Sequence, residues 1–229
     1  MTDESASRAP HRTEAPHDGV SRFLILASTS PRRRDLLTGA GIHFQHLSPG
    51  VDESYNRSDF DGPPSIVQAL ALRKARAVAA RLSGSRPVHE TALPGARDRV
   101  ILGADTMVEA EDGEILGTPV NRAEARVMLR MLSGRTHSVH TGVALVMPTG
   151  SGAEERTGVD TAAVTFHALS AAAIDAYIAT GECDDKAGAY GYQEKGRALV
   201  SRVEGDPQTV IGLPIALVQA LLKEMGWEQ

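Results

Sequence analysis

The chain has almost no cysteine, with Cys183 as its single copy in 229 residues. A lone cysteine cannot form a disulfide within the chain, and it cannot supply the clustered thiolates of a structural zinc site. The sequence also contains no apolar run near the roughly 18 residues that a membrane-spanning helix needs. We therefore expect a protein of a reducing compartment, the cytoplasm, that has no membrane segment.

Positive charge is not in excess either. The formal net charge is -5, so the chain lacks the general basic character of nucleic-acid-binding proteins, and we expect no nucleic-acid partner. A polyanionic ligand would have to meet positive charge gathered locally. Residues 1–21 are rich in Ser, Pro, His and charged residues and contain no apolar core of a secretory signal. The sequence predicts a disordered tail there, followed by one domain over residues 22–229.

Hydrophobic residues make up 41% of the chain, and their spacing alternates between the periods of strands and helices. The expected strands cover residues 23–27, 100–104, 106–110, 139–147, 157–167 and 199–203. The expected helices begin at Pro31, Ser65, Asn121, Ser170 and Pro214, and Ser30 and Asn121 are typical N-cap residues. Crossovers and hairpins together predict an α/β domain around a mixed sheet.

A basic segment, STSPRRR at residues 28–34, lies between an expected strand and the first turn of a helix. A helix start offers free N–H groups and partial positive charge, and arginines add bidentate donors, so this segment is suited to phosphate binding. Arginine at a helix start opposes the helix dipole, which favours a functional reason for its presence. The alternative is a capped helix with a solvated basic face.

Lys74 is a charged residue on the apolar face of the second expected helix. At about 100 degrees per residue, it shares that face with Val67, Leu70 and Val78. A lysine in this position needs an anion close by or a route to solvent. Snorkelling to solvent at the edge of the core is the alternative to a functional role.

Carboxylates occur at two further places. Asp105 stands where an apolar strand pattern ends, a position that suits a catalytic acid because rigid backbone fixes it, although such an Asp is also an ordinary turn former. Asp52 and Glu53 form an acidic pair that is either functional or a solvated loop. Two or three carboxylates together with substrate phosphates would supply the oxygen ligands that Mg²⁺ needs.

A small, glycine-rich segment, DDKAGAYGYQ, covers residues 184–193. Glycine lets the backbone come close to a ligand, and the Gln193 amide offers both a donor and an acceptor to a base edge. The segment is neither a Walker loop nor a dinucleotide fingerprint. Its alternative interpretation is an ordinary flexible connection.

Taken together, these segments resemble the Maf family of nucleotide pyrophosphatases. The resemblance runs from about residue 23 to residue 227 and is carried by LILASTSPRRRDLL, VDES, ALRKARAVA, ILGADTMV, MLSGRTHSVHTGVAL, DDKAGAYGYQ and VIGLP. It implies an elongated mixed β-sheet flanked by helices, similar to the fold of the inosine triphosphate pyrophosphatases. It also implies a homodimer, a divalent cation (Mg²⁺ or Mn²⁺) as cofactor, and hydrolysis of a nucleoside triphosphate to its monophosphate and pyrophosphate.

The resemblance also implies roles for individual residues. Asp105 matches the general base or a metal ligand, Glu53 and Lys74 match other active-site residues, and Asp105 and Glu53 are the expected metal ligands. The residues expected to bind the substrate are Ser28, Arg32, Arg33, Thr106, Lys186 and Gln193. Three of these, Arg32, Thr106 and Gln193, match the family type that acts on dTTP and UTP.

Two alternatives remain for the function. The first is hydrolysis of 7-methyl-GTP, and the second is a non-catalytic role in septum formation and cell division. One departure from the family pattern supports the second: Leu-Gly-Lys-Pro is replaced here by LGTP at residues 116–119, so Thr118 stands where a lysine is expected near the phosphates. Either the activity is weakened by this loss, or another base such as Arg122 or Arg135 substitutes for that lysine. Glu194 and Lys195 also enlarge the loop after Gln193.

Overall fold

The structure is a computed structural model that describes residues 23–83 and 99–227. The tail predicted over residues 1–21, and the loop predicted over residues 85–99 except for its last residue, lie outside the described residues. None of the described helices combines the length and apolar character that a bilayer crossing requires.

The centre of the fold is a mixed seven-stranded sheet, which confirms the predicted α/β class. Its strands are β1 (Phe23–Leu26), β2 (Phe44–His46), β3 (Arg99–Glu109), β4 (Ile115–Leu116), β5 (Thr136–Thr149), β6 (Gly152–Phe166) and β7 (Val200–Glu204). They follow the order β2-β1-β3-β5-β6-β7, with β4 also paired to β3. β1 runs parallel to β2 and β3, whereas the other pairs are antiparallel.

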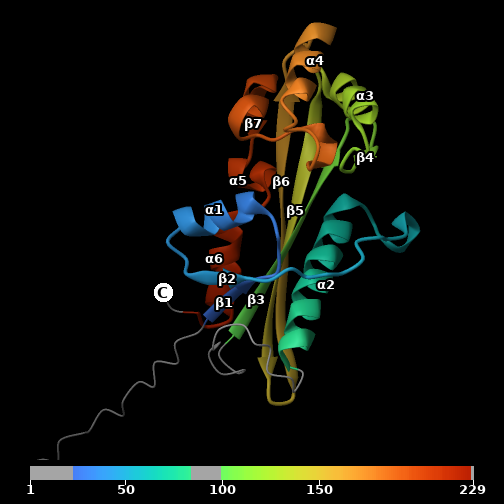
Figure 1. The fold of residues 1–229 in the computed structure, drawn as a ribbon. Helices are drawn as coiled ribbons and strands as arrows, with labels where there is room; N and C mark the ends of the chain where they lie inside the picture. The colour runs from blue at the N-terminus through green and yellow to red at the C-terminus, as the bar shows by residue number, and fades with distance from the viewer. Residues whose placement is uncertain (1–22, 84–98, 228–229) are drawn as a thin grey trace, which may run out of the picture.

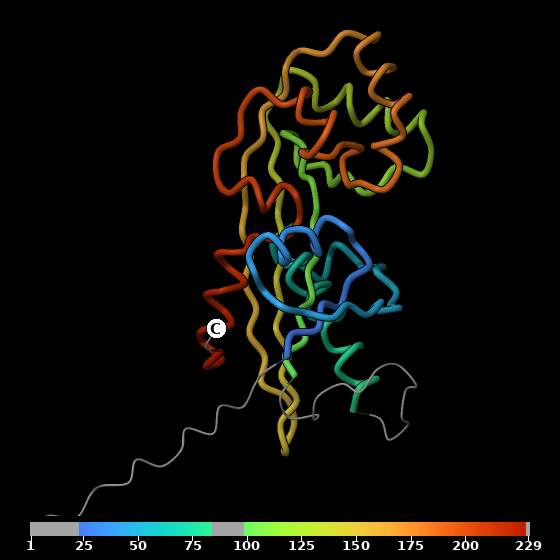
Figure 2. The backbone as a smooth tube through the Cα atoms, turned by 60° about the vertical axis from the view of Figure 1, so that its left-hand side comes forward, coloured from blue at the N-terminus to red at the C-terminus, as the bar shows by residue number. Residues whose placement is uncertain are grey.

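The molecule is elongated because β5 and β6 run along its whole length (Figure 1). A first lobe contains β1, β2, α1 (Pro31–Gly39), η1 (Arg57–Asp59), α2 (Pro63–Ser83) and α6 (Ile215–Glu224). A second lobe contains β4, α3 (Arg122–Leu132), α4 (Ala171–Ala179), η3 (Ala187–Ala189), η4 (Glu194–Leu199) and β7. The short helix α5 (Pro207–Ile211) lies between the lobes, and Figure 2 shows α1 directly beneath the second lobe.

Helix α2 lies unusually close to the sheet. Its buried face includes Val67 and Ala71, which meet β5 and β3 at two glycines. A Cβ atom on Gly103 would lie 2.1 Å from the Ala71 carbonyl oxygen, and one on Gly142 would lie 2.4 Å from the Val67 carbonyl oxygen. Because glycine has no Cβ, the helix can rest directly on the backbone of the sheet. This close approach brings the buried face of α2, Lys74 included, next to the middle of β3.

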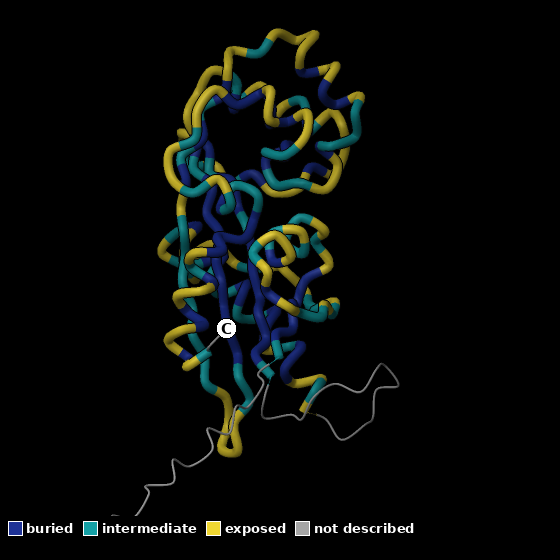
Figure 3. The backbone as a smooth tube through the Cα atoms, turned by 90° about the vertical axis from the view of Figure 1, so that its left-hand side faces the viewer, coloured by how far each residue is buried: buried dark blue, intermediate teal, exposed yellow. Residues whose placement is uncertain are grey.

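The two sides of the sheet have separate apolar clusters in the first lobe. One cluster joins α1 and α6 to β1, β3 and β5, and the other joins α2 to the opposite face of the same strands. A third cluster fills the second lobe between α3, α4 and the far ends of β5 and β6. The central strands are accordingly buried while the outer turns are exposed (Figure 3). The polar groups described below are therefore held by rigid, packed elements.

The predicted strand boundary at Asp105 is wrong. The sequence predicts a strand that ends at Ala104 and a second that begins at Thr106, but β3 continues through both, so Asp105 lies inside a strand. The strand continues because it pairs with β5 from Ile101 to Glu109 without a break. The parallel neighbour of β3, β1, is the strand that ends near Asp105. A local hydrophobic pattern cannot distinguish the end of a strand from the end of the strand beside it.

The remaining elements follow the predictions closely, with β5 and β6 longer than expected. The predicted N-cap of α3 is confirmed, since the Asn121 side chain accepts a hydrogen bond from the Glu124 N–H at 2.9 Å. β2, α5 and the short helices η1, η3 and η4 are absent from the predictions. Each is only a few residues long, too short to show a hydrophobic period.

Candidate active site

A cleft opens at a gap along one edge of β3. β5 occupies the other edge of this strand, so β1 and β4 share the first edge. The pairing with β1 reaches Leu102 and the pairing with β4 begins at Val108. Between them lies a cleft of about 210 Å³, which Asp105 and Thr106 line. Asp105 and Thr106 are consecutive in the strand, so their side chains reach the cleft from opposite faces of the sheet.

This cleft collects the predicted residues from distant parts of the chain. Its walls include Arg32, Arg33, Glu53, Lys74, Asp105, Thr106, Lys186 and Gln193. An adjoining cavity of about 300 Å³ shares several of these residues and contains Ser28. The structure therefore brings all nine residues proposed from the sequence to one place, at the meeting of the two lobes.

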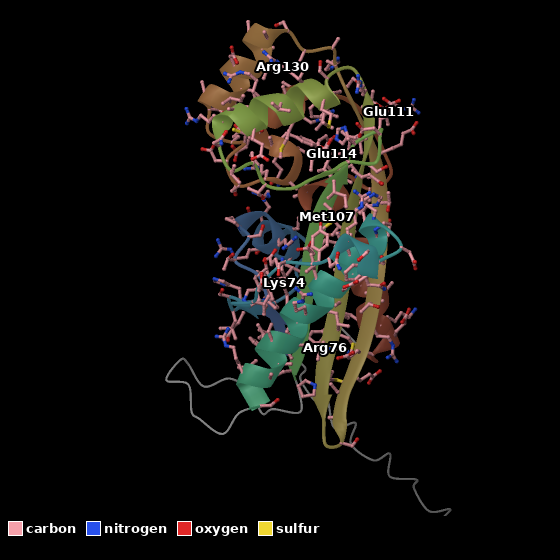
Figure 4. The ribbon with its side chains drawn as sticks, turned by 90° about the vertical axis from the view of Figure 1, so that its right-hand side faces the viewer. Lys74, Arg76, Met107, Glu111, Glu114 and Arg130 are labelled. Atoms are coloured by element: carbon pink, nitrogen blue, oxygen red, sulfur yellow. The ribbon has the colours of Figure 1, made fainter. Side chains whose placement is uncertain are left out.

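Lys74 is held between two carboxylates. Its Nζ atom lies 2.6 Å from Asp105 Oδ1 and 2.9 Å from Glu53 Oε2, and the whole residue is only 6% exposed. The anion required by its place on an apolar helix face is therefore present, and the lysine does not snorkel to solvent. Figure 4 shows Lys74 on α2, below Met107 of β3.

Asp105 has unusual electrostatics for an aspartate. Burial raises its pKa above the ordinary value, while the positive charges of Lys74 and Arg33 pull the pKa back down in part. A carboxylate with a raised pKa is a better proton acceptor than an exposed one. Glu53 is the more exposed partner of Lys74, and its neighbour Asp52 instead accepts hydrogen bonds from Ser54 and is absent from the cleft walls.

The two adjacent arginines of α1 differ in their surroundings. Arg33 makes three hydrogen bonds within the protein: Nε to the Gly212 carbonyl oxygen at 2.9 Å, and its terminal nitrogens to Ser28 Oγ at 3.3 Å and Thr106 Oγ1 at 3.2 Å. Burial lowers the pKa of its guanidinium below the ordinary value. Since a guanidinium has five N–H donors, these bonds fix Arg33 and still leave donors for a ligand in the cleft.

Arg32 faces the second lobe. It donates to Asp185 Oδ2 at 3.2 Å, and Lys186 donates to Asp185 Oδ1 at 2.5 Å. Burial by itself would raise the Asp185 pKa, but the hydrogen bonds and charges of these two cations outweigh it and hold the pKa below its ordinary value. Asp185 thus joins two cations from opposite lobes. The sequence analysis assigns no role to Asp185. Its place beside Lys186 in a glycine-rich segment is the one sequence feature that could have indicated a role.

Thr118 lies in the wall of the cleft together with Lys186 and Gln193. The family pattern has a lysine at this position, and a lysine here would also lie in the cleft wall. Neither Arg122 nor Arg135 is among the lining residues, so the structure does not place either arginine as its substitute. Among the described residues, the cations that line the cleft are Arg32, Arg33, Lys74 and Lys186.

The same site offers oxygen ligands for a cation. In the described ranges, no three His, Cys, Asp or Glu side chains cluster in a way that could hold a metal ion. Asp105 and Glu53 nevertheless converge from two elements on Lys74. Mg²⁺ is commonly bound by one or two carboxylates, with substrate phosphates and water as the other ligands. The carboxylate pair fits a metal site of that kind, whose other ligands would be substrate phosphates and water.

Comparison with known proteins agrees with the motifs. The family model described as "Maf-like protein" matches residues 23–225. The chain is 46% identical over 204 residues to the dTTP/UTP pyrophosphatase of Symbiobacterium thermophilum, covering 89% of this chain and 94% of the relative. It is 48% identical over 203 residues to the protein of the same name from Moorella thermoacetica, with 89% and 95% covered. It is 42% identical over 207 residues to the protein of that name from Bacillus anthracis, which covers 90% of this chain and 96% of the relative. The resemblance inferred from the motifs is confirmed.

Proposed function

This chain belongs to the Maf family, and on that basis we propose that it hydrolyses dTTP and UTP to the nucleoside monophosphate and pyrophosphate, as a housekeeping enzyme of the nucleotide pool. The observation that carries the proposal is the contact of Lys74 with both Asp105 and Glu53 in a cleft that is also lined by Arg32 and Lys186. The names of the relatives support the choice of dTTP and UTP.

Asp105 acts as the general base. A water molecule attacks the α-phosphorus in line with the departing pyrophosphate, and Asp105 accepts its proton. Lys74 donates to Asp105 Oδ1 and so fixes the direction in which the carboxylate faces. A rigid strand and a helix packed directly on it hold both groups in position.

The cations of the cleft bind the triphosphate. Arg32 and Lys186 come from opposite lobes, and both are paired with Asp185. A triphosphate carries several negative charges, so it attracts these two cations more strongly than the single charge of the exposed Asp185 carboxylate does. Together with Arg33, they offset the charge that develops on the leaving pyrophosphate, since phosphoryl transfer depends mainly on positioning and electrostatic stabilisation.

Gln193 reads the base, because its amide can pair with both a donor and an acceptor on a pyrimidine edge. Asp105 and Glu53 hold a divalent cation, Mg²⁺ or Mn²⁺, which supplies further charge neutralisation at the phosphate oxygens when bound. The enzyme works in the cytoplasm as a homodimer. Light scattering on the purified full chain measures the oligomeric state directly.

The two alternatives have less support. A 7-methyl-GTP pyrophosphatase would need a different set of residues at Arg32, Thr106 and Gln193, all of which match the dTTP/UTP type and line the cleft. A non-catalytic septum regulator would not require a buried Lys74 between two carboxylates. Forming such a buried ion pair is costly, and binding a partner at the surface gives no reason for it.

The proposed activity is tested by pyrophosphate release from a panel of nucleotides in Mg²⁺ and in Mn²⁺. The panel contains dTTP, UTP, dCTP, CTP, ATP, GTP and 7-methyl-GTP. We expect the highest kcat/KM for dTTP and UTP. Faster turnover of 7-methyl-GTP would favour the first alternative, and no pyrophosphate release from any nucleotide would contradict the proposal.

A further inference from the structure

A row of polar side chains crosses the sheet behind the cleft. Thr106 of β3 lies directly opposite Thr141 of β5, and Thr141 lies directly opposite Asp160 of β6. Side chains that face each other across neighbouring strands lie on the same face of the sheet. The Thr106 and Thr141 hydroxyl oxygens are 2.9 Å apart, and Thr141 has no exposed surface.

The donor and acceptor of each hydrogen bond between these hydroxyl groups can be assigned. Thr141 donates its hydroxyl hydrogen to the carbonyl oxygen of Thr209 in α5, at 2.7 Å. A hydroxyl group has one hydrogen to donate, so Thr141 must accept from Thr106. The Thr106 hydroxyl hydrogen is then used as well, and its oxygen remains an acceptor. Arg33 donates to that oxygen at 3.2 Å.

Thr141 also supports Arg33 by a second route. Thr209 is fixed at its carbonyl by Thr141 and at its hydroxyl by Asp160. α5 ends at Ile211, and the carbonyl oxygen of its C-cap residue, Gly212, accepts from Arg33 Nε at 2.9 Å. Gly212 has a φ of +119° and lies so close to Thr106 that an added Cβ atom would be 3.2 Å from the threonine hydroxyl oxygen. Two of the three protein partners of Arg33 are therefore held in place by one buried hydroxyl group.

We propose that Thr141 is a positioning residue, whose hydroxyl group orients the Arg33 guanidinium toward the substrate phosphates through Thr106 and through α5. Thr141 is not among the residues that line the cleft and acts only through its neighbours. Thr106 likewise contributes by orienting Arg33, because its own hydroxyl hydrogen is already donated to Thr141. The assignment rests on the proposed function, since Arg33 meets phosphates only if the cleft binds a nucleotide.

The first test compares Thr141→Val with Thr141→Ser. Valine keeps the shape and removes both hydrogen bonds, whereas serine keeps the hydroxyl group. We expect Thr141→Val to lower kcat for dTTP by about 10- to 100-fold, in line with the cost of small misplacements in an active site. Thr141→Ser should recover most of that rate. Equal losses in both variants would overturn the proposal.

Thr136→Val is the matched control. Thr136 lies on the same strand, and its hydroxyl oxygen is 2.8 Å from that of Thr165, so the change again breaks a threonine pair between β5 and its neighbour. This pair is exposed and outside the cleft. We expect kcat within about twofold of wild type. A loss as large as that of Thr141→Val would show that any broken threonine pair on this strand impairs the enzyme, which would contradict the proposal.

A double-mutant cycle separates positioning from a general loss of structure. Arg33→Lys is combined with Thr141→Val. If Thr141 acts through Arg33, its replacement should lower kcat less than about twofold further once Arg33 is already changed, because residues that act as a unit are not additive. Losses that multiply in the double variant would assign Thr141 a purely structural role.

A measurement on Arg33 itself needs no activity. The Arg33 Nε–H signal is identified by ¹⁵N NMR from its disappearance in Arg33→Lys, and its hydrogen exchange is followed. We expect exchange at least about tenfold faster in Thr141→Val than in wild type or Thr136→Val, because hydrogen-bonded N–H groups are protected. Unchanged exchange would overturn the proposal even in an active enzyme. Fast exchange in Thr141→Val, with no triphosphate turnover by the wild type, would instead contradict only the proposed function.

Discussion

Lys74 and Asp105 form an ion pair inside the fold, with the lysine Nζ atom 2.6 Å from the aspartate Oδ1 atom. Both residues are 6% exposed. The pair exists because α2 rests on β3 at Gly103, two residues before Asp105, where only glycine allows so close a contact. Buried ion pairs contribute little net stability, so the reason for this pair lies more in the chemistry of the cleft than in the stability of the fold.

Asp105→Asn should abolish most of the activity. The amide keeps the shape of the side chain but cannot accept the proton of the attacking water. We expect kcat for dTTP to fall by about 10²-fold or more, in line with general-base contributions. Asp175→Asn is the control, because Asp175 pairs with Arg126 on the surface of the second lobe and is absent from the cleft walls. An Asp105→Asn enzyme as fast as the control would remove Asp105 from the mechanism.

Lys74→Met should make stability depend on pH in a particular direction. The pKa of Asp105 is already raised by burial, and removing the neighbouring cation raises it further. The folded variant then binds a proton at a pH where the unfolded chain does not, so its stability falls as pH rises through that range. We expect a loss of about 3–5 kcal/mol in unfolding free energy near neutral pH, shrinking as the pH is lowered through the folded pKa of Asp105.

Denaturant unfolding at a series of pH values measures this effect. Arg76→Met is a matched control on the same helix, since Arg76 pairs with Glu155 at the surface and its side chain is 59% exposed. Exposed pairs contribute about 0–1 kcal/mol, so this variant should differ little from wild type. A constant deficit for Lys74→Met across the whole pH range would show that Asp105 does not become protonated when its partner is lost.

Thr118→Lys should improve substrate binding. The change restores the lysine of the family pattern to the wall of the cleft. An additional positive charge near the phosphates should lower KM for dTTP by about 3- to 10-fold, and the gain should shrink as salt screens the charge. Thr118→Gln, which has similar length and no charge, should not reproduce it. An equal gain with glutamine, or a gain that does not respond to salt, would contradict the electrostatic explanation.

Gln193→Leu should weaken the choice of base. Losing one or two hydrogen bonds to the pyrimidine edge should raise KM for dTTP and UTP by about tenfold and reduce the preference for them over 7-methyl-GTP. Gln219→Leu is the control, since Gln219 is an exposed residue of α6 outside the cleft. Steady-state kinetics with the three nucleotides provide the comparison. An unchanged preference in Gln193→Leu would place base recognition elsewhere.

Local patterns in the sequence predict much of this arrangement. The helical period places Lys74 on the buried face of α2. Ser30 and Asn121 occupy the N-cap positions of α1 and α3, although only Asn121 makes a side-chain capping hydrogen bond. The interior position of Asp105 is not predictable in this way, because it depends on β5 pairing with β3 after β1 has ended. Strand pairing is set by residues far apart in the chain, which a local pattern does not contain.

The different environments of Arg32 and Arg33 have the same origin. The two arginines are adjacent and chemically identical, so the local sequence does not predict that their surroundings differ. Arg33 is fixed by Gly212, 179 residues away, whereas Arg32 meets Asp185, 153 residues away. The sequence likewise does not predict the row formed by Thr106, Thr141 and Asp160. Thr106 and Thr141 are 35 residues apart and become neighbours only through the register of β3 and β5.

Hydrolysis of dTTP in ¹⁸O-labelled water shows which phosphorus atom the water attacks in this enzyme. Water attack at the α-phosphorus with Asp105 as the base predicts that the products are dTMP and pyrophosphate, with the label entirely in dTMP. Mass spectrometry of a single turnover determines both the products and the position of the label. Formation of dTDP and phosphate, or label in pyrophosphate, would contradict the proposed reaction at this site.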